Sequence, residues 1–342
     1  MPTADEARIA TEVMDAPIVQ SQMPPIARES SVGPLQPGPG TVLPPTGAAS
    51  APLVARDARP LDSPERSHPQ SAISSSVTET EQAESPPDYI FALGRIVPRF
   101  PSLSVEKEFA QATGRADANG LTDREALRTV LTDRANRYLA RQLAWVFTVE
   151  GQETYLLVPR DPADFELLIE SVRPTPRATD IDVIIGVRGP LAPPEYANGL
   201  VLPFGLVDQI FSFDVDALIS SLPRPEDRSP EQFGSAAEDL FARLVQIADN
   251  AGATDEHRAL NFLAVRYPRI YHQMAEAFTR NFALASVRVR PSRLSGVRRI
   301  SDVVFTWRHR ETDVEESFFV RVDHTEEFPF LVTGLSPYLE RL

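Results

Sequence analysis

The chain has 342 residues, of which 42% are hydrophobic, and it carries a formal net charge of −14 and no cysteine. The negative charge argues against a general nucleic-acid-binding protein, because such a protein needs a basic surface. The lack of cysteine excludes disulfides, thiol nucleophiles and cysteine-type zinc sites.

No segment has the length and hydrophobicity of a membrane span. The longest apolar run, residues 199–213, is interrupted by Pro203 and Asp208 and is shorter than the roughly 20 residues that a span requires. The first residues are acidic and lack the apolar stretch of a secretory signal. We therefore expect a cytoplasmic protein that binds neither membranes nor nucleic acid.

Residues 1–87 contain no Phe, Tyr or Trp and are rich in Pro, Ser, Ala and Gly. Such a segment cannot bury enough apolar surface to offset the entropy of an ordered chain. It is predicted to be a disordered tail or tether, and a polyproline ligand around Pro34, Pro37 and Pro39 is the alternative. The folded part is expected to begin at residue 88, directly before Tyr89.

Residues 88–221 read as a mixture of strands and helices. Residues 89–100 are predicted to be extended, and Thr122 with Glu125 forms a capping box for a helix that should run to about Gln142. A short helix is expected after Asp161, with Pro162 in its first position. The other strand-like segments are residues 143–149 and 153–159, which should form a hairpin, and residues 181–190 and 199–213.

A second subdomain is predicted from residue 222 to residue 342. Ser229 and Pro230 start an amphipathic helix, and two more helices follow, capped by Thr254 and separated at Pro268. The hydrophobic period then changes to two, which predicts an antiparallel sheet of residues 284–291, 300–309, 314–325 and 328–335. The fold class is therefore α+β: a disordered tail followed by two packed subdomains.

No known catalytic motif is present. The sequence lacks G-x-S-x-G, H-E-x-x-H, a Walker loop and a dinucleotide-binding G-x-G-x-x-G. Of the five histidines, His309 and His324 lie on the two arms of a predicted hairpin; His309 should face Val314, which leaves His324 beyond the ladder. We therefore expect no metal ligand, cofactor or catalytic residue, and we expect the acids Asp323, Glu326 and Glu327 to form a solvated face.

Arginines are concentrated near the first strand of the C-terminal sheet. Arg288 and Arg290 are two positions apart and so share one face of that strand, and Arg293 follows in the turn. Together with Arg298 and Arg299 they form a local basic patch suited to a carboxylate-rich peptide.

The alternative is that these arginines pair inside the chain with three acids across the hairpin, Glu311, Glu315 and Glu316. Arg95 and Arg99 pose the same choice between a partner and an internal ion pair. Alternation along the first strand should point both of them to one side, opposite Ile96 and Phe100. Arg288, Arg290, Arg293, Arg95 and Arg99 are thus the candidate partner-binding residues.

Several long stretches of the sequence resemble stretches of one protein family, and they occur in the same order along the chain. They are "YIFALGRIVPRFPSLSVEKEFAQATGR", "RDPADFELLIESVRPTP", "DVIIGVRGP", "NAGATDEHRALNFLAVRYP" and "FFVRVDHTEEFPFLVTGLSPY". From about residue 88 to residue 342 the chain resembles the C-terminal domain of unknown function of PatG, the multi-domain protease family of patellamide and other cyanobactin maturation pathways. The resemblance implies a setting of ribosomally made, post-translationally modified peptides, and it implies no catalytic residue.

The resemblance also implies a dimerising two-part fold with a structural zinc held by cysteine. This chain departs from that pattern, because Ala144 and Ala197 stand where relatives are expected to carry cysteine. Neither the metal nor its ligands are therefore carried over.

Two functions remain open from the sequence. One is a non-catalytic accessory module that binds a partner protein or a precursor peptide, and a homodimer is one option for its assembly. The other is an enzyme that acts on a modified peptide through dispersed acids and arginines. A deep pocket with a perturbed titratable group would favour the enzyme, and a flat apolar patch would favour the module.

Overall fold

The computed structural model describes residues 87–339, except for residues 116–120, 223, 225–228 and 247–248. The tail predicted for residues 1–87 therefore lies outside the described residues, apart from Pro87 at its end. In the described part no helix is long and apolar enough to cross a membrane.

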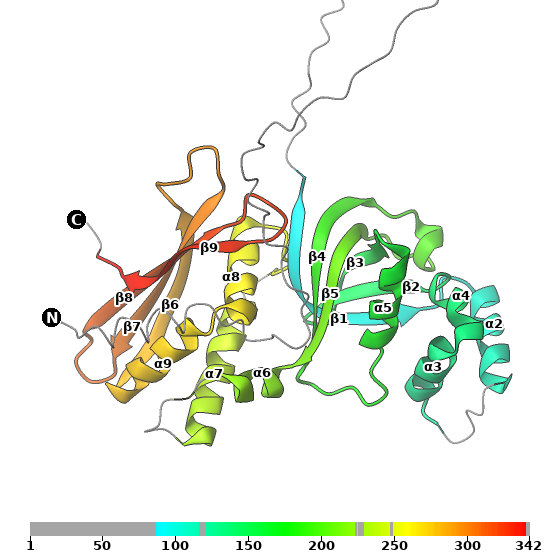
Figure 1. The fold of residues 1–342 in the computed structure, drawn as a ribbon, viewed down its shortest axis with the longest axis horizontal. Helices are drawn as coiled ribbons and strands as arrows, with labels where there is room; N and C mark the ends of the chain where they lie inside the picture. The colour runs from blue at the N-terminus through cyan, green and yellow to red at the C-terminus, as the bar shows by residue number, and fades with distance from the viewer. Residues whose placement is uncertain (1–86, 116–120, 223, 225–228, 247–248, 340–342) are drawn as a thin grey trace, which may run out of the picture. The chain divides into compact units, whose positions relative to one another are not determined.

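The first half of the described chain forms a closed barrel (Figure 1). Its strands are β1 (Tyr89–Arg99), β2 (Ala144–Val149), β3 (Gln152–Pro159), β4 (Asp180–Leu191) and β5 (Pro203–Asp214). The order around the barrel is β1-β2-β3-β5-β4, and every pair is antiparallel except β3 with β5. The predicted hairpin is confirmed by β2 and β3, whose turn residues Glu150 and Gly151 both have positive φ, as in a type I′ turn.

The first aromatic residues of the chain, Tyr89 and Phe91, lie on strand β1, which packs against hydrophobic side chains on both of its faces. Ile90 belongs to the hydrophobic cluster of the barrel, whereas Phe91 and Leu93 belong to the cluster of the second half. A strand that is buried on both faces reads as a nearly continuous apolar run. Gly94 allows β2 to approach closely, because a Cβ there would lie 2.2 Å from the carbonyl oxygen of Thr148.

The helices of the barrel half are short. They are α2 (Leu103–Arg115), α3 (Asp123–Thr132), α4 (Arg137–Ala140) and α5 (Phe165–Ser171), with 3-10 turns at Arg134–Asn136, Pro162–Asp164 and Pro194–Ala197. The predicted capping box is confirmed: Thr122 Oγ1 accepts from the Glu125 amide at 3.3 Å, and Glu125 Oε2 accepts from the Thr122 amide at 2.8 Å.

The prediction of one helix as far as Gln142 is wrong. Helix α3 ends at Thr132, and Asp133 is extended with ψ of 123°. The Asp133 carboxylate accepts from the Ala135 amide at 3.0 Å and so starts a new 3-10 turn before α4. A side chain that bonds the local backbone competes with helix continuation, which is why aspartate ends the helix here.

The second half packs helices against a sheet. The helices are α6 (Val215–Ser221), α7 (Pro230–Val245), α8 (Asp255–Arg266) and α9 (Arg269–Thr279). The strands are β6 (Phe282–Pro291), β7 (Ile300–His309), β8 (Glu315–Asp323) and β9 (Phe330–Pro337), antiparallel in the order β6-β7-β8-β9. The predicted helix starts at Ser229 and Thr254 and the predicted C-terminal sheet are confirmed, as is the α+β class.

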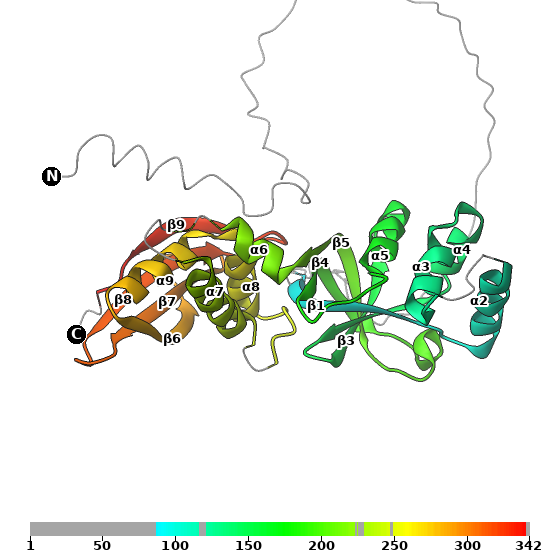
Figure 2. The ribbon, with the colours of Figure 1, turned by 90° about the horizontal axis from the view of Figure 1, so that it is seen from below.

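One face of this sheet packs on α7, α8 and α9 (Figure 2). Val303, Phe305 and Trp307 of β7 lie on that inner face, within the same cluster as the buried side chains of the three helices. The alternate β7 residues, among them Asp302, lie on the other face of the sheet, which we call the outer face. Asp302 is paired in register with Arg290 of β6.

The barrel and the second half share contacts along β1. Phe91 packs edge-to-face on Phe262 of α8 with ring centroids 6.4 Å apart. The backbone of Phe91 donates to the Gly252 carbonyl at 2.9 Å and accepts from Asn261 Nδ2 at 2.8 Å. The division into subdomains at residue 222 stays a prediction.

Candidate functional site

The predicted arginine patch lies partly on the outer face of the C-terminal sheet. Arg288 and Arg290 are exposed on β6, whereas Val287 and Val289 pack toward the core, so the two arginines share one face. The cross-strand neighbour of Arg288 is Val304 of β7.

The acids proposed as internal partners for this patch bind elsewhere. Glu316 accepts from both terminal nitrogens of Arg280, at 2.9 and 2.7 Å, and Glu315 accepts from Arg308. Glu311 accepts from Asn281 at 3.3 Å. These acids do not reach the arginine patch because of the strand register. It places Glu315 and Glu316 opposite Arg308 and Trp307, at the far end of β7 from Asp302.

Instead, Arg290 meets a buried carboxylate. Its Nη2 lies 3.6 Å from Oδ2 of Asp302, a side chain that is 7% exposed. Asp302 Oδ1 accepts from Nε of Arg321 on β8 at 2.9 Å. The two guanidiniums also stack on rings, Arg290 on Tyr338 and Arg321 on Phe319, each with 4.7 Å to the ring centroid.

These side chains surround a cavity of about 330 Å³, which we call the arginine pocket. Its lining residues are Arg290, Pro291, Arg293, Asp302, Arg321, Tyr338 and Leu339. Among the described lining residues, three arginines against one aspartate leave two positive charges in excess. In the part of the chain that the structure describes, Arg293 has no carboxylate within ion-pair distance. The pocket is therefore suited to an anion, and Arg321 is a member that sequence reasoning missed.

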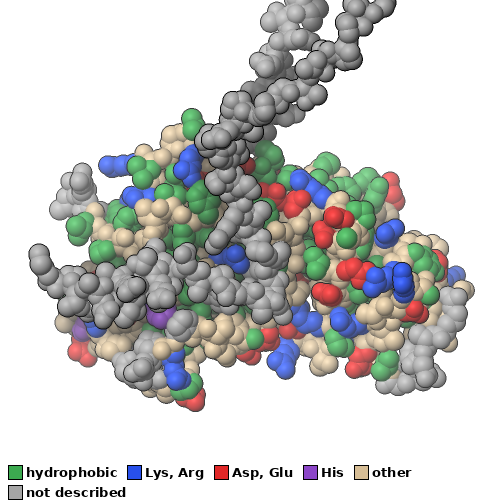
Figure 3. All heavy atoms as spheres, viewed as in Figure 1, with side chains coloured by type: hydrophobic (Ala, Val, Ile, Leu, Met, Phe, Trp, Pro, Cys, Tyr) green, Lys and Arg blue, Asp and Glu red, His purple; other side chains and the backbone are tan. Residues whose placement is uncertain are grey.

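Arg95 and Arg99 belong to a different place. Arg95 donates to the Ala178 carbonyl, and Arg99 forms an ion pair with Glu153, so both have partners within the chain. Ile96 is buried on the opposite side of β1, as the alternation predicted. On the face of the barrel half shown in Figure 3, basic and acidic side chains are interspersed, so neither sign dominates there.

A second polar cluster, which the sequence did not reveal, lies at the end of β7 and β8. Ser301 Oγ is 2.8 Å from Nε2 of His324, and Nδ1 of His324 is 3.2 Å from Oδ1 of Asp255 in the first turn of α8. The imidazole and carboxylate are within ion-pair distance, but the His324 N–H is not aligned for a good hydrogen bond. We call these three residues the serine site.

Asp255 is held in its charged form by its neighbours. Burial would raise the pKa of Asp255, but its contacts with His324 and with the guanidinium of Arg299 outweigh burial and lower that pKa below the ordinary value. The serine site opens on a cavity of about 340 Å³, which Arg298 and Arg299 also line. His324 lies past the ladder and His309 donates its amide to the Val314 carbonyl at 2.8 Å, as predicted, so the two histidines do not converge.

The expectation that Asp323, Glu326 and Glu327 form a solvated face is wrong for two of them. Asp323 is fully buried, and its Oδ1 accepts from the Thr325 amide at 2.8 Å. Burial, with the hydrogen bond and charge of Asp208, raises the pKa of Glu327 to about 7. Only Glu326 is exposed, because the chain turns inward at both ends of this loop.

The residues present do not fit the cysteine-held zinc that the resemblance implies. Ala144 and Ala197 lie in one small hydrophobic cluster with Val146, Leu156 and Ala192. In the described residues no group of three or more His, Asp or Glu is placed to hold a metal ion. Apolar packing occupies the place where the resemblance would put the cysteine ligands.

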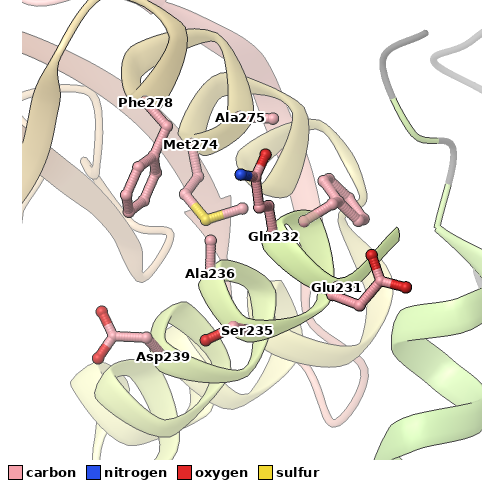
Figure 4. Close-up of a pocket in the computed structure, with 9 residues that line it drawn as sticks. Glu231, Gln232, Ser235, Ala236, Asp239, Met274, Ala275 and Phe278 are labelled. Carbon is pink, nitrogen blue, oxygen red and sulfur yellow. The ribbon is translucent and has the colours of Figure 1, made fainter. Parts of the chain in front are cut away.

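A third hollow, between α7 and α9, has the opposite chemistry to the arginine pocket (Figure 4). Its volume is about 690 Å³, and Met274 and Phe278 of α9 give it an apolar wall. Glu231 and Asp239 of α7 also line it, and none of its described lining residues is an arginine. This groove would repel an acidic peptide, so the arginine pocket is the candidate site for one.

The fold and the pocket define a two-part α+β protein with a basic pocket on its C-terminal sheet. The family model described as PatG C-terminal matches residues 227–338, which include all elements from α7 to β9. The resemblance seen in the sequence is thus confirmed over these residues, which are similar to the PatG C-terminal domain.

A solved structure described as the PatG domain of unknown function shares the fold. The TM-score is 0.60 at 21% sequence identity, over 73% of this chain and 98% of the solved chain. None of the curated proteins matches the chain.

Proposed function

We propose that the chain is an accessory interaction module in the maturation of ribosomally synthesised, post-translationally modified peptides, and that it docks an acidic peptide or an acidic segment of a partner protein. The setting rests on the PatG C-terminal match over residues 227–338. The single observation that carries the docking site is the arginine pocket, with its excess of two positive charges in a protein of net charge −14.

The chemistry of the pocket favours a carboxylate. A guanidinium presents a planar fork of donors that matches a carboxylate with two parallel hydrogen bonds. Asp302 contacts both Arg290 and Arg321, and the Tyr338 ring stacks on Arg290. Because these contacts already restrict the two side chains, less side-chain entropy is lost when a carboxylate binds. Arg293 and Arg288 are exposed beside them and add long-range attraction.

The test is binding of a short glutamate-rich peptide, labelled with fluorescein, to the full chain. Replacing Arg288, Arg290 and Arg293 together by Ser should weaken binding by about 1–3 kcal/mol, since each exposed charge pair contributes about 0–1 kcal/mol. Arg321 is left in place, because it neutralises the buried Asp302. The same peptide with glutamine in place of glutamate should bind far less well, and added salt should weaken binding of the acidic peptide.

A matched control is Arg308→Ser on the same sheet, where the arginine is exposed and already paired with Glu315. It should leave peptide binding unchanged. If the triple variant loses thermal stability and keeps its peptide affinity, the arginines serve the fold and the proposal is wrong.

A further inference from the structure

The serine site has the order of contacts that nucleophilic catalysis requires. The hydroxyl of Ser301 faces Nε2 of His324 at 2.8 Å, and the other ring nitrogen faces the Asp255 carboxylate at 3.2 Å. In this arrangement the imidazole can take the hydroxyl proton while the carboxylate stabilises the imidazolium that forms. All three residues line one cavity of about 340 Å³, in which Ser301 is 4% exposed.

We propose that Ser301 is a nucleophile for acyl transfer from an ester, with His324 as its base and Asp255 as the carboxylate that stabilises the imidazolium. This inference stands independently of the peptide-docking proposal, because it rests on different residues. It would give the chain a catalytic activity next to its docking surface.

Backbone hydrogen bonds hold His324 in place. The His324 amide donates to the Arg299 carbonyl at 2.9 Å, which extends the β7–β8 ladder by one pair beyond Ile300 and Asp323. The His324 carbonyl accepts from Arg258 at 2.6 Å. His324 is 1% exposed, so its ring cannot turn freely toward water. Rigid positioning of this kind is what a nucleophile and its base need.

The negative charge that develops on the ester carbonyl oxygen must be stabilised by a hydrogen-bond donor or a cation. Ser301 is paired with Val322 in the β7–β8 ladder, so its own amide is engaged in the sheet. Arg298 lines the cavity, and its guanidinium contacts Asp323 and stacks on Phe330. A fixed guanidinium can stabilise an oxyanion, and Arg298 is the residue of this cavity that we assign to that role.

The reaction acylates Ser301 and then hydrolyses the acyl-serine. A bond forms between Ser301 Oγ and the ester carbonyl carbon, and the hydroxyl proton moves to His324 Nε2. The bond from that carbon to the alcohol oxygen breaks, and His324 returns the proton to the departing alcohol. Water then attacks the acyl carbon and gives a proton to His324 Nε2. The bond from that carbon to Ser301 Oγ breaks, and His324 returns the proton to Oγ as the carboxylic acid leaves.

The experiment is covalent labelling of the full chain with a fluorophosphonate, followed by mass spectrometry of the modified peptide. The phosphorus atom would bond to Ser301 Oγ and fluoride would leave. We expect an adduct on Ser301 that Ser301→Ala abolishes. The matched control is Ser295→Ala, because Ser295 lines the same cavity but donates to the Ser292 carbonyl; its labelling should equal that of the parent.

His324→Gln tests the role of the base. It should slow labelling of Ser301 by at least about 100-fold, which is the lower range for loss of a general base. Circular dichroism of each variant establishes that the fold is retained before rates are compared. The proposal is overturned if the folded parent forms no adduct at Ser301, or if Ser301 is labelled equally fast in the His324 variant.

Discussion

The contribution of Arg258 to stability can be worked out from its contacts. It is 1% exposed in α8, and its guanidinium donates to the carbonyls of His324 at 2.6 Å, Glu327 at 3.1 Å and Glu326. It also stacks on Tyr89 of β1, 5.3 Å from the ring centroid. One side chain thus ties the β8–β9 loop to α8 and to the first strand.

We expect Arg258→Met to lower the free energy of unfolding by about 3 kcal/mol. The methionine keeps most of the buried volume, so the main loss is that of three carbonyls left without a donor, at about 1 kcal/mol each. Burial and the charge of Arg299 lower the pKa of Arg258 to about 10, so the arginine is charged at neutral pH and its burial is costly. The variant no longer buries a charge, and this partly offsets the stability lost with the three hydrogen bonds.

The assay is urea unfolding followed by circular dichroism. The slope of the free energy of unfolding against urea concentration is compared between parent and variant. Arg269→Met is the control: Arg269 is exposed on α9 with a 3.8 Å ion pair to Glu276, and it should change stability by less than about 0.5 kcal/mol. A loss below about 1 kcal/mol for Arg258→Met at an unchanged slope would refute the reasoning.

Two further predictions concern pH and metal. The folded-state pKa of Glu327, raised to about 7 by burial and by Asp208, lies above its ordinary value of 4.5, so the folded chain binds the proton more tightly. Stability should therefore fall as pH rises from about 4.5 to about 7. Glu327→Gln mimics the protonated acid, so it should raise the melting temperature at about pH 8 and change it little at about pH 5; an equal effect at both values would contradict this. Treatment with EDTA should leave the melting temperature unchanged, because apolar packing around Ala144 and Ala197 stands in place of a metal site. Stoichiometric zinc by elemental analysis, lost together with stability, would show the opposite.

The elements that could be predicted are those specified by short-range signals. The capping box at Thr122, the cap at Ser229 and the β2–β3 hairpin each depend on a few neighbouring residues. The C-terminal sheet followed from alternation within its own strands. Asp133, which ends α3, shows the limit, because a helical pattern continues beyond it while its side chain bonds the local backbone.

What could not be predicted depends on register and long-range pairing. The barrel closes through a parallel pair, β3 with β5, that no local pattern indicates. Arg321 enters the arginine pocket because β8 places it opposite Asp302. The serine site combines the first turn of α8, the start of β7 and the residue after β8, so no spacing in the sequence reveals it.

The central claim is that the arginine pocket binds a carboxylate-bearing peptide through charge. The most direct measurement is a charge swap: Arg293→Glu in the chain, titrated with the glutamate-rich peptide and with its lysine counterpart. Arg293 is suited to this because it lines the pocket, is exposed, and has no carboxylate within ion-pair distance in the described residues. We expect the variant to bind the acidic peptide more weakly and the lysine peptide more tightly than the parent does. Equal affinities of parent and variant for both peptides would contradict the claim.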